Sequence, residues 1–135
     1  SSGVVVDLTT GLMWQRCPVG YEWKSAACVL PAGAVTTFTW EQALEQAAKS
    51  KGFAGFADWR VPNKNELGSI VDYACAQPAL DAQLFPDTQP SGYWTSSPNA
   101  FTPQRAWAIN FSYGDHMSSN RTDQLGVRLV RDVPR

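Results

Sequence analysis

The chain has 135 residues, of which 44% are apolar and 17% are charged, and its formal net charge is −1. This length is typical of one domain, which can bury a core without help from a bound metal. No run of Lys or Arg is present, which excludes non-specific nucleic-acid binding through phosphate contacts. No stretch approaches the roughly 20 apolar residues of a membrane-spanning helix. We therefore expect neither a nucleic-acid partner nor direct membrane insertion.

The three cysteines indicate one disulfide. Cys17 and Cys28 flank a loop that contains Gly, Trp and Lys, a pattern typical of a loop-closing pair. Such a bond favours an oxidising compartment. Cys75 is left over, either as a buried thiol or as the partner of a cysteine in a second chain. A metal site is the alternative use of these cysteines, but the sequence has no CxxC pair and a single His.

The first half of the chain predicts a hairpin and a helix. Within residues 4–15, two short β runs flank a Thr-Thr-Gly turn. Residues 16–37 hold Pro, Gly and both loop cysteines, and we interpret them as an irregular insertion. Thr39 and Gln42 form a capping box that begins the first helix, and Gly52 is expected to end it.

The second half predicts another helix and then strands. Asn63 is expected to cap this helix, with Glu66 completing the box. Its buried stripe is expected to be Leu67, Ile70, Val71 and Ala74. Residues 93–131 then show several short strands with alternating apolar and polar residues. A hairpin, two helices and a run of antiparallel strands predict an α+β fold, with the N- and C-terminal strands paired.

Eight short motifs occur in an order that resembles a known bacterial family. They are Asp7; Thr10 to Trp14; Thr39-Trp40 with Ala43; Asp58 to Pro62; Asn63 with Glu66-Leu67; Tyr93 to Ser97; Trp107 to Phe111 with Gly114; and Val127 to Arg131. Together they look like the domain named after the C-terminal domain of the Legionella collagen-like adhesin (Lcl). Each motif alone is weak, but eight in the right order are specific, and they cover nearly the whole chain.

The resemblance implies a C-type-lectin-like fold across residues 1–135, with a local insertion at about 16–37. It also implies a secreted or surface-anchored bacterial protein, outside the cell or in the periplasm. The family's namesake attaches to sulfated polysaccharides as a trimer, so a glycan or a cell-surface protein is the expected partner, and a homotrimer the expected assembly. The sequence departs from the family where cysteines are common, at Lys49 to Lys51 and at Val127 to Leu129.

Several residues of these motifs suit a structural role. Asp58, Trp59 and Arg60 are interpreted as a core anchor with two polar residues that tie the loop to the neighbouring backbone or to each other. Four further tryptophans are expected in the core because they fall on helix or strand stripes: Trp14, Trp40, Trp94 and Trp107. Trp23, in the predicted irregular insertion, is expected to be the most exposed aromatic residue of the chain.

The candidate binding residues lie in a polar stretch at 112–123. They are Tyr113, Asp115, His116, Asn120, Arg121 and Asp123. Such residues combine a large contact area with adaptable hydrogen bonding, although a merely solvated loop would have a similar composition. The arginines of the last third could add an anion-binding face, but solvated strand edges and a solvated tail are the favoured interpretation: Arg105, Arg121, Arg128, Arg131 and Arg135.

We do not expect an enzyme. His116 is the only His, and neighbouring Asp115 is not placed to orient it in a catalytic triad. Enzymes of the formylglycine-generating type, which resemble this fold, use a late cysteine pair with copper, and no cysteine follows Cys75. We also predict no cofactor and no dedicated calcium site. The sequence therefore favours a binding or adhesion module, and the alternative is a structural or oligomerisation head of a larger surface protein.

Overall fold

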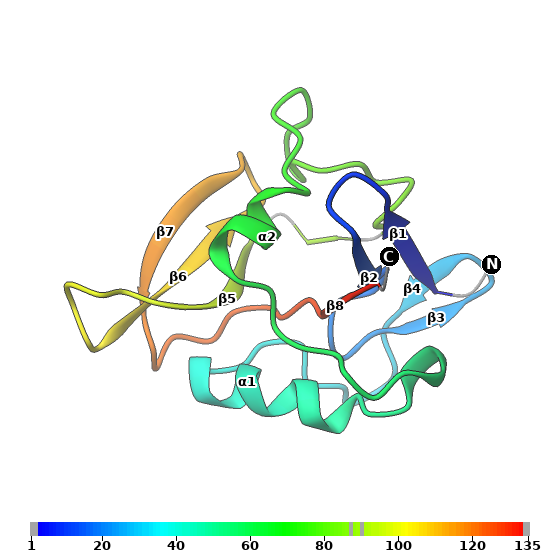
Figure 1. Ribbon diagram of the computed structural model, residues 1–135, viewed down its shortest axis with the longest axis horizontal. Coiled ribbons are helices and arrows are strands. Elements are labelled where there is room, and N and C mark those ends of the chain that lie inside the picture. The colour runs from blue at the N-terminus through cyan, green and yellow to red at the C-terminus, as the bar shows by residue number, and fades with distance from the viewer. Residues whose placement is uncertain (1–2, 87, 90, 134–135) are drawn as a thin grey trace.

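A three-stranded sheet joins the two ends of the described chain. The computed structural model describes residues 3–86, 88–89 and 91–133. Strands β1 (Val4–Asp7), β2 (Leu12–Gln15) and β8 (Val130–Asp132) form an antiparallel sheet in the order β1-β2-β8 (Figure 1). The predicted pairing of N- and C-terminal strands is therefore confirmed. It is made through β2, the second strand of the N-terminal hairpin, whose residue Trp14 lies opposite Val130.

The insertion at 16–37 contains a second hairpin. Among the described strands, β3 (Glu22–Lys24) and β4 (Ala27–Val29) pair only with each other, so the prediction of an irregular segment was wrong. A turn with positive φ at Ser25 and Ala26 connects them. The predicted disulfide is confirmed, because Cys28 of β4 is bonded to Cys17, just after β2. The disulfide fixes this hairpin to the N-terminal sheet.

Two helices begin at the predicted caps. Helix α1 (Trp40–Lys49) starts with the Thr39–Gln42 capping box and ends at Ser50, two residues before the predicted Gly52. A short 3-10 helix, η1 (Phe53–Gly55), follows it. Helix α2 (Lys64–Gly68) starts at the Asn63 box but has only five residues.

The buried stripe predicted for α2 was therefore too long. Of its four residues only Leu67 is in the helix, where it is fully buried. Ile70 and Val71 follow in turns and are half-buried against the core, while Ala74 is exposed. The apolar spacing was real, but the chain turns away after Gly68 and packs these side chains without a continuing helix.

The second main sheet contains β5 (Gly92–Pro98), β6 (Arg105–Asn110) and β7 (Asp115–Asn120), in that order. Helix α1 lies on one side of this sheet and α2 on the other (Figure 1). Strand β7 lies at one edge of this sheet and contains three of the six candidate binding residues, Asp115, His116 and Asn120. Within the described residues, no helix is long and apolar enough to cross a membrane.

The core consists of two clusters, one on each side of the chain's central strands. Trp14, Trp59 and Trp94 are buried, whereas Trp40 and Trp107 are half-buried, so the core expectation held for only part of the set. Trp40 instead donates its Nε1–H to the carbonyl of Thr95 at 2.9 Å. Trp23 is half-buried too.

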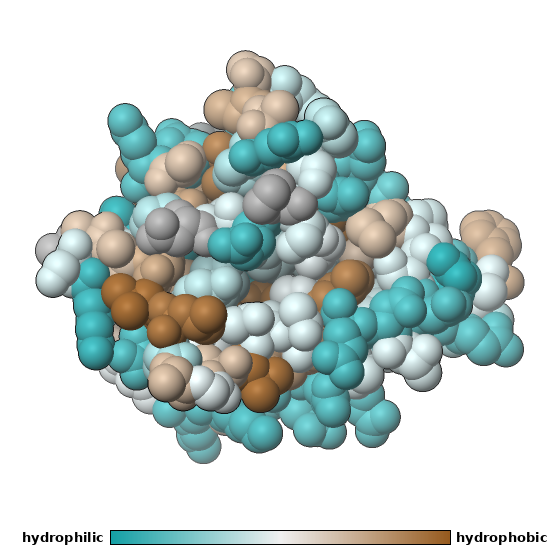
Figure 2. Space-filling view, turned by 180° about the vertical axis from the view of Figure 1, so that it is seen from behind, coloured by the Kyte–Doolittle hydropathy of each residue, from teal (hydrophilic) through white to brown (hydrophobic). Residues whose placement is uncertain are grey.

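The prediction that Trp23 is the most exposed aromatic residue was therefore wrong. Among the described residues, the most exposed aromatic side chains are Phe101, Tyr73 and Tyr113. Exposed apolar side chains also lie at the end of β4 and after it, at Val29, Leu30 and Val35. Figure 2 shows the back of the molecule, where apolar surface gathers on one side and polar side chains cover much of the remainder.

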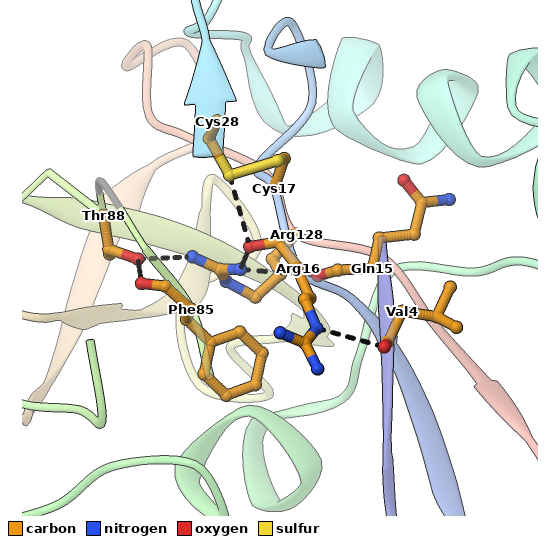
Figure 3. The surroundings of a disulfide bond; sticks show 8 residues. All are labelled: Val4, Gln15, Arg16, Cys17, Cys28, Phe85, Thr88 and Arg128. Carbon is orange, nitrogen blue, oxygen red and sulfur yellow. Dashed lines mark hydrogen bonds between the residues drawn. A yellow bond between two sulfur atoms is a disulfide. The ribbon is translucent and has the colours of Figure 1, made fainter. Parts of the chain in front are cut away.

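Two arginines that were expected at solvated positions are buried. Arg128 has no exposed surface, and its Nη1 and Nη2 donate to the Arg16 carbonyl and to Thr88 Oγ1, both at 2.8 Å (Figure 3). Its guanidinium also lies 4.7 Å from the ring centre of Phe85. Burial lowers the pKa of Arg128 to about 10, because the charged form loses its hydration. Arg135 lies outside the described residues.

Asp58 and Arg60 do not pair with each other. Asp58 accepts from Nε of buried Arg131 at 2.6 Å, and this hydrogen bond holds the Asp58 pKa below its usual range. Arg60 makes a bidentate pair with Glu66 at 2.6 and 2.7 Å and a second ion pair with Asp132. These contacts connect the loop before α2 to β8, so both side chains hold the fold together.

We expect Glu66→Gln to lower the free energy of unfolding at pH 7 by about 1 kcal/mol, since the pair is partly solvated. The Arg60 hydrogen bond lowers the pKa of Glu66 in the folded state. The carboxylate therefore stabilises the fold above its unfolded pKa, and this contribution is lost as the pH falls through the folded pKa. Urea unfolding of both proteins between pH 7 and pH 3 should show curves that converge in acid. A constant difference would contradict the assignment.

Candidate functional site

The six predicted binding residues do not form one cluster. Asp115 and Asn120 are the two ends of β7, and five residue steps at about 3.4 Å place them about 17 Å apart. Tyr113 precedes the strand and is 59% exposed, and its hydroxyl accepts a hydrogen bond from Gln77 Nε2. At the other end, Asp123 accepts from the backbone N–H of Asn120 in a turn. The predicted stretch is therefore divided between two separate regions, one at each end of β7.

The region around Tyr113 adjoins a large hollow. Gly114 packs so tightly against Val71 that an added Cβ would lie 2.5 Å from that side chain. Val71 and Tyr73 line a pocket of about 770 Å³, whose opposite wall is formed by residues 5–8 of β1 and the following turn. The carboxylates of Asp72 and Asp81 are also on its lining, so this hollow is apolar with an acidic rim.

The alternation of β7 separates its polar side chains onto two faces. His116 and Asn120 lie on the face covered in part by α2, because they pair with Ile109 and Arg105 of β6. Asp115 points to the opposite face, as adjacent residues of a strand do. Arg121 stacks on Trp40 of α1, with its guanidinium carbon 4.3 Å from the ring centre. Only two of the six predicted residues therefore share a surface.

We call this surface the β6–β7 face. It consists of Lys64, Asn99, Arg105, Trp107, His116, Ser118 and Asn120. Helix α2 covers the part of this face near His116, since a Cβ at Gly68 would lie 3.8 Å from both His116 Nε2 and Ile109 Cδ1. The part that contains Arg105 extends beyond the helix and stays open.

Arg105 is the cation of the β6–β7 face that neighbouring groups hold by three hydrogen bonds. Its Nε donates to Ser118 Oγ at 2.9 Å, its Nη1 donates to Asn120 Oδ1 at 2.8 Å, and its Nη2 donates to the Ser118 carbonyl. Asn99 Nδ2 donates to the same Ser118 hydroxyl at 3.0 Å. A guanidinium has five N–H donors, so two remain for a ligand. Cross-strand pairing thus holds Arg105 in one orientation before any ligand binds.

Aromatic surface lies beside this cation. The ammonium of Lys64 lies 4.6 Å from the ring centre of half-buried Trp107. Phe101, in the loop between β5 and β6, is 95% exposed. Neither Lys64 nor Arg105 forms an ion pair with a carboxylate among the described residues. The face therefore offers net positive charge, amide and hydroxyl groups and the half-buried Trp107 ring, and Phe101 is exposed in the adjoining loop, where its backbone N–H donates to Asn99 Oδ1.

The sequence alone did not identify the central residues of this face. Arg105 was named only as one of several arginines, and Trp107 was assigned to the core. The available signal was the alternation of β6, which puts Arg105 and Trp107 on the same side of the strand. Choosing between core and surface required knowledge that α2 stops at Gly68 and leaves this side uncovered.

The sequence model of the Lcl C-terminal domain family matches residues 3–131. The chain belongs to this family. The match includes both helices, the β6–β7 face and all three sheets except the last residue of β8. None of the curated proteins searched matches the chain.

Proposed function

We propose that this Lcl C-terminal domain is a non-catalytic adhesion module that binds an anionic glycan through the β6–β7 face. The observation that carries the proposal is Arg105, a guanidinium fixed by three hydrogen bonds, without a carboxylate partner among the described residues. Sulfate groups present oxygens that accept from such a fixed donor pair. Lys64 adds a second positive charge on the same surface.

The neighbouring groups fit a carbohydrate. Exposed Phe101 and half-buried Trp107 offer apolar surface for the C–H face of a sugar ring. Asn99, Ser118 and Asn120 offer amide and hydroxyl groups for sugar hydroxyls. An open sheet face also suits a polymer, which can extend beyond both ends of the contact, better than it suits a small metabolite.

A hydrolytic reaction has no arrangement to support it on this face. His116 and Asp115 point to opposite faces of β7, so the carboxylate does not orient the imidazole. The proposal places the module outside the cytoplasm, and the Cys17–Cys28 disulfide supports an oxidising compartment. A C-type-lectin-like fold and a homotrimer are the family-based expectations that accompany it.

The test is a glycan array that includes sulfated polysaccharides and their unsulfated counterparts. We expect binding to sulfated chains only, weakened by added salt because the contact charges are partly exposed. Arg105→Ala should reduce the affinity about tenfold, the value of one charge-assisted contact. Lys51→Ala removes an exposed positive charge outside the face and should bind normally. Equal binding by both variants, or no binding to any glycan, would contradict the proposal.

A further inference from the structure

A second hollow lies beside the disulfide, remote from the β6–β7 face. Its volume is about 580 Å³, and its walls come from the end of β2, from β3 and from the η1 region. The polar residues on its lining are Gln15 and Glu22, and its aromatic residues are Tyr21, Trp23 and Phe53. Cys17 of the disulfide also contributes, so the insertion that the disulfide fixes is part of this site.

Gln15 carries a buried donor with no partner. Its side chain is 7% exposed, and its Nε2 forms no hydrogen bond with any described residue. The backbone N–H of Gln15 donates to the Leu129 carbonyl, and its own carbonyl accepts from Arg128, so the main chain is occupied in the sheet. Figure 3 shows the amide extending away from the Arg128 contacts. A buried unpaired amide lowers stability and calls for a physical explanation.

The aromatic walls are held in place. Trp59 donates its Nε1–H to the Phe53 carbonyl at 2.9 Å and packs edge-on against the Phe53 ring. On the other side, Arg16 lies 5.4 Å from the centre of the Trp23 ring, and a Cβ at Gly3 would come within 3.0 Å of that ring. The rings are therefore fixed before a ligand arrives.

The charge of the hollow excludes the ligand proposed for the other face. Among the described residues that line it, Glu22 alone is charged, and its exposed carboxylate already pairs with the Lys24 ammonium at 3.2 Å. The lining itself therefore offers no cation to an anionic sugar. The interior instead combines apolar rings with one amide donor, which suits a small apolar group that carries a carbonyl oxygen.

We propose that this hollow binds the acetamido group of an N-acetylated sugar. The acetamido carbonyl accepts the unpaired Nε2–H of Gln15, and its methyl group and the sugar ring pack on the aromatic walls. The Glu22 carboxylate accepts from the acetamido N–H or from a ring hydroxyl at the rim. This site is independent of the β6–β7 face and of its anionic ligand.

The experiment uses matched sugars. The chain is titrated with N-acetylglucosamine, N-acetylgalactosamine, glucose and galactose, and binding is followed by nuclear magnetic resonance. We expect at least tenfold weaker binding of the two sugars without the acetamido group. Contacts between the acetamido methyl protons and the Trp23 ring protons should also appear. Equal binding of all four sugars, or of none, would overturn the proposal.

Gln15→Met supplies the matched variant, since Met has a similar shape and no donor. It should reduce N-acetyl sugar binding about tenfold and leave the melting temperature unchanged or raised, because Gln15 Nε2 donates to none of the described residues. A lower melting temperature with unchanged sugar binding would show that the amide is structural, and would overturn the proposal. Arg105→Ala should bind N-acetyl sugars normally. Binding of N-acetyl-lysine amide but of neither N-acetyl sugar would also reject the sugar assignment.

Discussion

Arg128→Ala is expected to lower the free energy of unfolding by about 3–5 kcal/mol, the range for deleting a large buried side chain. The change would leave a cavity against Phe85 and would remove the donor for the Arg16 carbonyl and for Thr88 Oγ1. Arg128 connects three segments that are distant in sequence, so its loss should loosen all of them. Urea unfolding, followed by tryptophan fluorescence, measures the effect.

Arg105→Ala is the matched control for Arg128→Ala, because it removes a half-buried arginine on the surface of β6. Arg105→Ala should lower the free energy of unfolding by only about 1 kcal/mol, since the hydrogen bonds of Arg105 join partly solvated groups. Arg128→Lys keeps the charge but presents a single nitrogen, so it should restore only part of the lost stability. A loss below 1 kcal/mol in Arg128→Ala would show that the buried guanidinium is dispensable.

Removal of the disulfide has the second largest expected effect. The double change Cys17→Ser and Cys28→Ser should cost about 3 kcal/mol, because the bond closes a loop with a sequence separation of 11. Among the described strands, the β3–β4 hairpin pairs with no other, so the disulfide is the bond that holds it against the N-terminal sheet. Unfolding in denaturant measures the cost, and the reduced natural chain should match the variant.

Cys75→Ser serves as the control for the disulfide variant. Cys75 is the free cysteine and is half-buried, so this change should alter stability by no more than about 0.5 kcal/mol. Loss of the disulfide should also weaken N-acetyl sugar binding, because Trp23 lies opposite Cys28 in the hairpin. A double variant as stable as the natural chain would contradict the role given to the bond.

Local features of the fold could be predicted from the sequence. Both helix starts depend on side chains three residues apart, at Thr39 with Gln42 and at Asn63 with Glu66, and both capping boxes are present. The Thr-Thr-Gly turn likewise predicted the N-terminal hairpin. The end of α2 could not be predicted, because the apolar spacing continues through Val71 while the chain leaves the helix at Gly68.

Features that depend on partners far away in the chain could not be predicted from the sequence. Arg128 reads as the polar position of an alternating strand, but its acceptors are 40 and 112 residues away, and only the folded chain shows them enclosing it. For the candidate site, the polar composition of residues 112–123 indicated the region of β7. The alignment of β7 with β6 then decides that Arg105 meets Asn120, and that information is absent from the composition of either strand.

The central claim is that the β6–β7 face binds anionic glycans. The most direct measurement is the affinity of the natural chain, Arg105→Ala and Lys51→Ala for dextran sulfate, with uncharged dextran as the matched polymer. We predict binding of dextran sulfate alone, weakened about tenfold by Arg105→Ala and unchanged by Lys51→Ala. Binding that Arg105→Ala leaves intact, or that dextran shares, would contradict the claim.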